Sequence, residues 1–303
     1  MKTHLHFKWA ILVMAVIFLN SFVSSNELKA QTGNALNFDG TDDYVNISPV
    51  VPFTSNFTIE GWIKTTDVSA KLFVWGSPTV NGHVYLGLNL GKLRLAYGDG
   101  IGIDQLDGLS TVSDNVWHHI AVVKSGTAVT CYLDGIQNGT GTTTRNPGSV
   151  TNSSIGGGLI NGTLQGFTLG TIDEVRVWNV ARTGTQIQNN KNCELNAQAG
   201  LVAAYHFNNG VANGNNIGFN LVADASGNNQ TGTLTNFALT GSTSNWTNSS
   251  SPASAEQYRS VASGDWGNLS TWEFFNGCTW QPALNTPNYT HSSIVIRSPH
   301  TVT

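Results

Sequence analysis

Acidic residues in two parts of the chain have types and positions that suit a cation. Asp39 and Asp42 belong to a turn that reads Asp-Gly-Thr-Asp-Asp, and Asp173 shares the phase of Val175 in an apolar strand pattern. A buried carboxylate needs hydrogen bonds or a cation, and Ca²⁺ takes about six to eight oxygen ligands. The residues therefore predict a structural calcium at Asp39, Asp42 and Asp173. The alternative is that the turn acids only shape the turn and that Asp173 accepts backbone hydrogen bonds.

One tryptophan has the position of a sugar-stacking residue. In the segment Phe57–Thr65, Trp62 shares its phase with Glu60 and Lys64, whereas the apolar residues occupy the other phase. A strand with this alternation buries one face, so Trp62 is expected on the solvent side, where its ring can contact a ligand. The alternative is partial burial of Trp62 beneath a loop. Trp117 is expected to pack inside the domain instead.

The cysteines and histidines do not form a metal motif. Cys131, Cys193 and Cys278 are too few and too scattered for a disulfide framework or a zinc site. They permit one bridge, for which Cys131 and Cys193 are the candidate pair; the alternative is that Cys131 is simply buried in its strand. His118 and His119 are consecutive in a strand pattern, so they face opposite sides and cannot jointly bind an ion.

The elements that position these residues are strands. From residue 34 to 179, short apolar alternations are separated by Gly, Asn and Asp, and only residues 181–192 look briefly helical. The Asp134-Gly135 pair is a hairpin-turn signal. This pattern predicts an all-β, antiparallel, two-sheet jelly-roll sandwich, followed by the start of a second β unit. The predicted interior residues are Phe57, Ile59, Ile63, Val122, Val175 and Val177.

The chain divides into four predicted regions. They are a signal peptide at 1–25 with cleavage as late as 30, a jelly-roll module at 33–247 with core motifs at 35–184, a linker at 248–257, and a second β unit at 258–303. The apolar run Trp9–Leu19 is shorter than the ~20 residues of a membrane span, so a secretory signal is preferred over a retained anchor. Because the last unit stops within a strand pattern, the sequence is expected to be a fragment of a longer protein.

Composition and charge exclude one class of partner. The 303 residues include 14 Lys and Arg and 18 Asp and Glu, which give a net charge of -4. Charged residues make up 11% of the chain, against roughly 25% in an average globular protein. The chain has no basic cluster, and nucleic acid is therefore excluded as a partner.

Six short motifs follow one another along residues 33–190. They are ALNFDGTDDYVNI, FTIEGWIKT, WHHIAVV, CYLDG, IGGG, and FTLGTIDEVRVWN with ARTG. In this order they resemble the LamG-like jelly-roll domains of the concanavalin A-like lectin and glucanase superfamily. The resemblance implies a structural calcium near the acidic turn. The terminal SGDWGNLSTW resembles the start of adhesin-like domains in exported bacterial proteins.

The acidic residues favour binding over catalysis within this superfamily. The superfamily includes retaining glycosidases, which need two carboxylates about 5 Å apart, but Asp173 and Glu174 are adjacent on a strand and are expected on opposite faces. We therefore expect a non-catalytic module, secreted or on the cell surface, that binds a glycan or an extracellular protein. Two alternatives are an accessory module of a secreted glycoside hydrolase whose catalytic domain lies outside this sequence, and a structural spacer in an adhesin.

Overall fold

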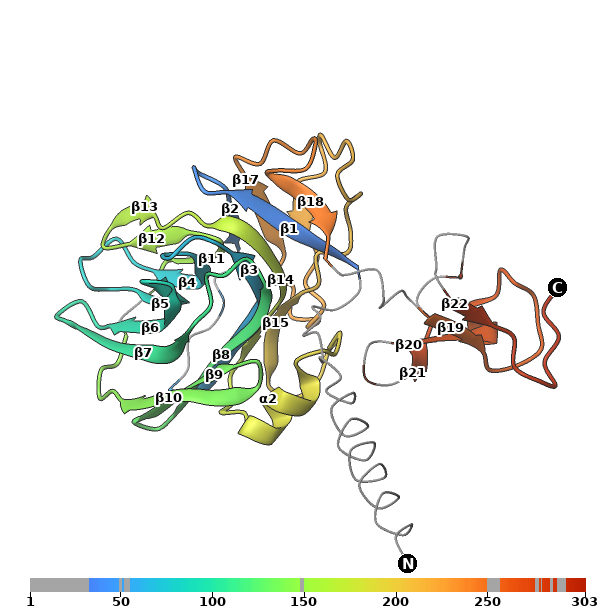
Figure 1. Ribbon diagram of the computed structural model, residues 1–303, viewed down its shortest axis with the longest axis horizontal. Helices are drawn as coiled ribbons and strands as arrows, with labels where there is room; N and C mark the ends of the chain where they lie inside the picture. Colours follow the sequence, from blue (N-terminus) through green and yellow to red (C-terminus); the bar gives the residue numbers. More distant parts are fainter. Residues whose placement is uncertain are drawn as a thin grey trace, which may run out of the picture.

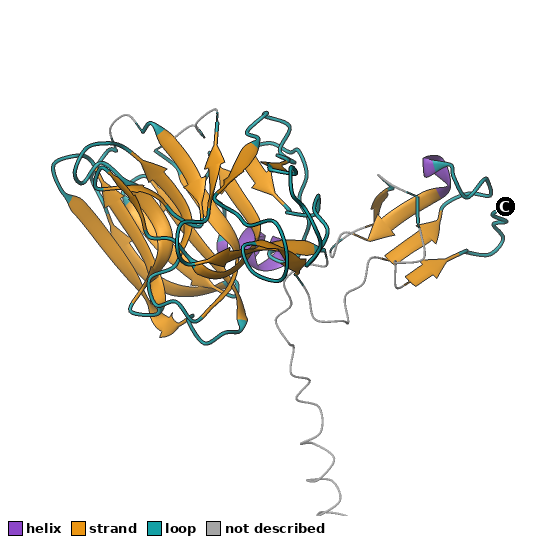
Figure 2. Ribbon diagram, turned by 90° about the horizontal axis from the view of Figure 1, so that it is seen from above, coloured by secondary structure: helices purple, strands orange, loops and turns teal. Residues whose placement is uncertain are grey.

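A computed structural model shows two stacked layers of strands followed by a smaller sheet (Figures 1 and 2). It describes residues 33–48, 51, 55–147, 150–249, 257–275, 278, 280–283, 286–287 and 293–303. The predicted signal peptide lies outside these residues. Within them, no helix is both long and apolar enough to cross a membrane.

The first layer, sheet I, is antiparallel and has eight strands. In spatial order they are β10 (Ile136–Thr142), β9 (Ala128–Leu133), β8 (Trp117–Ser125), β3 (Phe57–Thr65), β14 (Leu169–Trp178), β1 (Asn34–Asp39) and β18 (Asn245–Asn248). The eighth strand, β15 (Leu201–Tyr205), pairs with β14 beyond the end of β1. One edge of β14 is thus shared by two partners.

The second layer, sheet II, also has eight antiparallel strands. They are β16 (Leu221–Val222), β17 (Gly232–Thr235), β2 (Tyr44–Ile47), β11 (Asn152–Ile155), β4 (Lys71–Gly76), β5 (Val84–Asn89), β6 (Lys92–Gly98) and β7 (Ile103–Thr111). A short hairpin joins β12 (Gly158–Ile160) to β13 (Thr163–Gln165).

The smaller sheet, sheet III, follows the sandwich. Its strands are β21 (Trp280–Pro282), β20 (Trp272–Phe275), β19 (Gln257–Ser260) and β22 (Ser293–Val295), and a 3-10 turn at Leu269–Thr271 precedes β20. The predicted jelly-roll sandwich followed by a second β unit is therefore confirmed.

The core lies between sheets I and II, as the period-two phasing predicts. All six predicted interior residues belong to the main buried cluster, and none is more than 1% exposed. Phe57 of sheet I packs against Trp75 and Tyr97 of sheet II, with ring centroids 5.5 and 6.1 Å apart. The Asp134-Gly135 turn is also confirmed, because both residues have the positive φ of a type I′ turn, +54° and +83°.

One helix covers part of the outer face of sheet I. Within residues 181–192, α2 (Gly184–Asn190) begins with a capping box in which the Thr183 hydroxyl accepts from the Gln186 amide. The chain on either side of α2 is tied to the sheet: Thr58 donates to the Val180 carbonyl at 2.9 Å, and Arg176 donates to the Asn190 carbonyl at 3.0 Å. Further along the same face, a cleft is left open.

Candidate functional site

The cleft begins with a row of polar side chains across four strands. Strand register places Asn37 of β1 opposite Thr171 of β14, Thr171 opposite Lys64 of β3, and Lys64 opposite Trp117 of β8. Side chains alternate along a strand, so these four point away from the core that holds Ile63. The row presents an amide, a hydroxyl, an ammonium group and an indole ring side by side.

The cleft has a volume of about 580 Å³, which is within the usual range for ligand pockets of roughly 300–1,000 Å³. The Asn37 amide donates to the Thr171 hydroxyl at 3.1 Å, and this bond orients both groups. Lys64 and Trp117 are partly exposed. The remaining lining residues are Phe38, Asp39, Thr65, Thr66, Asn115, Leu169, Gly170, Thr243, Thr247 and Asn248. Such a surface can bond to hydroxyl groups and stack on the apolar face of a sugar ring.

The predicted exposure of Trp62 is wrong. Its side chain points to the outer face of sheet I, as its phase requires, but it is 0% exposed. The segment after α2 covers it: the indole Nε1 donates to the Lys191 carbonyl at 2.7 Å, and the His119 ring meets it edge-on at a centroid distance of 5.5 Å. The alternation of side chains predicts which face of a strand a residue occupies, but it does not predict whether a later segment of the chain covers that face. Trp62 is therefore a packing residue.

Beneath α2, the outer face of sheet I holds a buried ionic cluster. The fully buried Glu60 accepts a hydrogen bond from Trp178 Nε1 at 2.8 Å. The Nε atoms of Arg176 and Arg182 each lie 3.8 Å from Glu60 Oε1. Burial, reinforced by the nearby guanidinium groups, lowers the pKa of His119 well below its usual value, so this imidazole is neutral. The Glu60 carboxylate therefore faces the two buried guanidinium groups of Arg176 and Arg182, and His119 adds no further positive charge.

In the acidic turn, the third carboxylate beside Asp39 and Asp42 is that of Asp43, not that of Asp173. Ligand oxygens of Asp39, Asp42 and Asp43 all lie within 4.8 Å of one another. Asp43 is buried and accepts hydrogen bonds from the Asp39 amide and the Ser244 hydroxyl. Burial, together with the charges of Asp39 and Asp42, raises the pKa of Asp43 to about 6.

Asp173 lies elsewhere, and its predicted core phase is wrong. A β-bulge separates it from the residues that follow: Asp173 pairs with Trp62, but Arg176 pairs with Glu60 two residues away on β3. The extra residue inverts the phase, so Asp173 shares the outer face with Trp62. Its carboxylate accepts hydrogen bonds from the Glu174 amide at 2.8 Å and from the Ser249 hydroxyl. These bonds match the alternative in which Asp173 is held by the protein itself.

Calcium binding by the turn stays a prediction, now for Asp39, Asp42 and Asp43. Millimolar Ca²⁺ should raise the melting temperature by several degrees, because saturation at a hundred times Kd stabilises the folded state by ~2.7 kcal/mol. Mg²⁺ should do less, since it requires a tighter octahedral site. Asp42→Asn, at an exposed position, should abolish the shift. Identical melting curves with Ca²⁺ and with chelator would show that these three aspartates only shape the turn and bind no calcium.

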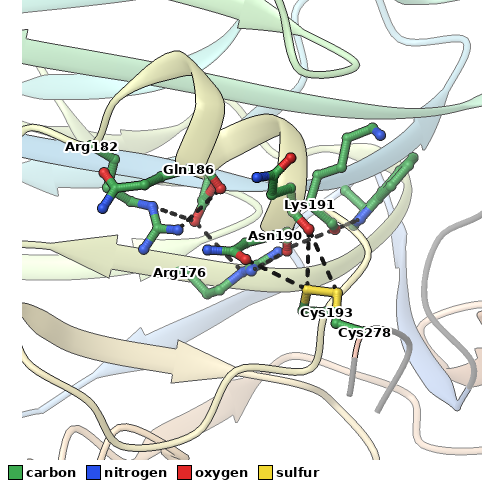
Figure 3. The surroundings of a disulfide bond; sticks show 10 residues. Arg176, Arg182, Gln186, Asn190, Lys191, Cys193 and Cys278 are labelled. Atoms are coloured by element: carbon green, nitrogen blue, oxygen red, sulfur yellow. Dashed lines mark hydrogen bonds and ion pairs between the residues drawn. A yellow bond between two sulfur atoms is a disulfide. The ribbon is translucent and has the colours of Figure 1, made fainter. Parts of the chain in front are cut away.

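The predicted Cys131–Cys193 bridge is wrong. Cys193 is bonded to Cys278 instead, with a Cα–Cα distance of 5.2 Å (Figure 3). Cys131 is a free, fully buried cysteine in the core between the sheets, and burial raises the pKa of its thiol to about 12. Cys193 follows α2 on the outer side of sheet I, so the sheet itself keeps the two thiols apart.

Trp117 is the cleft residue that we expected inside the domain. The sequence does indicate its outward position, because Trp117 is out of phase with Ile120 and Val122, which face the core. The loop residues of the cleft carry no such signal. Asn115 and Thr243 are distant in sequence, and only the folded sheet brings them to one surface.

Comparisons with known proteins agree with this architecture. Residues 39–188 match the family model of the concanavalin A-like lectin/glucanases superfamily. A proposed carbohydrate-binding protein from Bacteroides ovatus has 22% identity and a TM-score of 0.53 over 67% of this chain, which spans 58% of that protein. The CBM40 module of Ruminococcus gnavus IT-sialidase, solved with α2,3-sialyllactose, has 17% identity and a TM-score of 0.46 over 54% of this chain and 97% of its own.

A SAP-like pentraxin from Limulus polyphemus has 18% identity and a TM-score of 0.44, over 54% of this chain and 83% of its own. The search of curated proteins finds no match. The family assignment rests on the family model, the order of the motifs and the two-sheet architecture, and not on these structures. The two-sheet sandwich that contains residues 39–188 is a domain of the concanavalin A-like lectin/glucanases superfamily.

Proposed function

We propose that the jelly roll is a non-catalytic module that binds a glycan in the cleft of sheet I. The observation that carries this proposal is the row of Asn37, Thr171, Lys64 and Trp117 on adjacent strands. Glycan sites combine hydrogen-bonding side chains with an aromatic ring that covers the apolar face of a sugar. The Bacteroides ovatus protein that shares this fold is described as a proposed carbohydrate-binding protein, which agrees with this proposal.

The carboxylates of the cleft support binding rather than hydrolysis. A retaining glycosidase needs two carboxylates about 5 Å apart on either side of the scissile bond. Asp39 is the one acidic residue among those that line the cleft. Its acidic neighbour Asp43 is buried and engaged by the Asp39 amide and Ser244. We therefore assign no hydrolytic role to this surface.

We also propose that the module works outside the cell, secreted or held at the cell surface. The disulfide between Cys193 and Cys278 supports this location, because such bonds persist in oxidising compartments. The proposed functional unit begins at residue 33 and includes β18, which ends at Asn248, and the following β unit begins with β19 at Gln257.

Trp117→Ala tests the proposed site. Binding of the purified chain to a glycan array, followed by calorimetry with the best ligand, should show a loss of about 2 kcal/mol, or roughly thirtyfold in Kd, in this variant. The matched control is Trp266→Ala, which removes an exposed tryptophan between β19 and β20 and should leave Kd unchanged. Equal affinity of the wild type and Trp117→Ala for the glycan would show that the glycan does not bind at Trp117. A blank array would overturn glycan binding and favour a spacer or a protein ligand.

A further inference from the structure

A second group of ionisable side chains lies where β14 changes partner. β1 pairs with residues 169–172 and β15 with residues 175–178. Between them β14 bulges, and Glu174 adopts a φ of +50°, which is uncommon for a residue other than glycine. Bulges re-aim side chains. Here the Glu174 carboxylate meets His206, the residue after β15, with 2.9 Å between Oε1 and Nδ1.

Glu194 completes the group from a third segment, directly after the disulfide-bonded cysteine. Ligand atoms of Glu174, Glu194 and His206 all lie within 4.8 Å of one another. The Asn208 amide donates to Glu194 Oε1 at 2.6 Å and so orients this carboxylate. Outer hydrogen bonds of this kind are typical of metal ligands.

Two atoms of the group are left unsatisfied. The Glu174 side chain is 1% exposed, and its Oε2 has no hydrogen-bond partner among the described residues. The His206 side chain is 11% exposed, and within the same part of the chain its Nε2 also lacks a partner. Buried polar atoms without partners are rare in native proteins, and a bound ion would satisfy both of these atoms.

The surroundings carry an excess of negative charge. Asp173 precedes Glu174 and is also buried, so another carboxyl group lies directly beside the three proposed ligands. The guanidinium group of Arg176 lies close by, but it faces Glu60 and the Asn190 carbonyl. A cation held by the group would offset the repulsion between these carboxylates.

We propose that Glu174, Glu194 and His206 bind one Zn²⁺ ion. Two carboxylates and an imidazole form a mixed oxygen and nitrogen donor set, which suits zinc, whereas Ca²⁺ and Mg²⁺ take oxygen ligands. Three protein ligands leave one position of a tetrahedral site for water. The ion would connect β14, the segment after α2 and the end of β15. This proposal does not depend on glycan binding, because none of its three ligands lines the cleft.

The test is zinc binding by the full chain after its metals have been removed with a chelator. Calorimetry with ZnCl₂, and metal content after dialysis, should show one ion per chain. Zinc should raise the melting temperature by several degrees relative to chelator. A tenfold excess of Ca²⁺ should not displace it. Glu194→Gln and His206→Gln should each weaken zinc binding more than about tenfold.

His118→Gln is the matched control. The His118 side chain is 12% exposed and contacts the carboxylates of Asp114 and Asp134, so its burial and acidic surroundings resemble those of His206. This variant should keep the affinity of the wild type. Glu194 is partly exposed, so Glu194→Gln decides the question even if His206→Gln does not fold. The proposal is overturned if the wild type retains no zinc or if Glu194→Gln binds it with unchanged affinity.

Discussion

Glu60→Ala is expected to lower the free energy of unfolding by about 3–5 kcal/mol, because it leaves two buried guanidinium groups without their carboxylate. Arg176 is 0% exposed and Arg182 is 6% exposed, so water cannot replace the lost partner. The substitution also removes the acceptor of Trp178 Nε1. The charge and the hydrogen bond are lost together, at the centre of the face that α2 covers.

Urea unfolding followed by tryptophan fluorescence measures this loss. Asp107→Ala is the control, since it breaks the Arg94–Asp107 ion pair, whose Asp107 side chain is 41% exposed, and should cost less than about 1 kcal/mol. Glu60→Gln keeps the volume and one acceptor oxygen, so its cost should fall between the two. If Glu60→Ala and Asp107→Ala cost the same, Glu60 does not stabilise the fold through its charge.

Trp62→Ala is expected to cost about 3–5 kcal/mol of stability without loss of glycan affinity in the folded protein. The indole is fully buried, and its removal leaves a cavity beneath the segment that contains Lys191. Trp117→Ala should do the opposite and weaken binding while costing little stability, because Trp117 is partly exposed. The two tryptophans thus separate packing from recognition.

Thermal unfolding and calorimetry on the same preparations measure both effects. Trp62→Phe keeps an aromatic ring against His119 and loses the hydrogen bond to Lys191, so it should cost about 1 kcal/mol. A Trp62→Ala protein with wild-type stability and no glycan binding would make Trp62 a ligand contact after all.

The fold could be predicted from the sequence because its signals are local. The alternation of Phe57, Ile59 and Ile63 identifies the inner face of one strand whatever else the chain does. The Asp134-Gly135 pair defines a tight turn by its own backbone preference. Such signals, repeated along the chain, suffice for the two-sheet sandwich.

The candidate site could be predicted only in part, since its features depend on distant segments. The phase of Trp62 is correct, yet the chain around Lys191 removes it from solvent. A single extra residue at the bulge turns Asp173 to the other face of the sheet. The alternation of apolar and polar residues does not reveal where such a bulge occurs. The partner of Cys193 depends on which side of the sheet each thiol occupies, which spacing does not encode.

The bond between Cys193 and Cys278 determines how the molecule bears mechanical load. Tension applied to the chain beyond Cys278 passes directly to Cys193, so the 85-residue interval between them is excluded from the force-bearing path. That interval contains β15 to β20, including the edge strand β18, which pairs with β1, and two strands of sheet III. With the bond reduced, the same pull acts along β20, β19 and β18, and up to roughly 280 Å of contour length is released as the interval extends. The oxidised molecule is a short, stiff link, and reduction converts it into an extensible one.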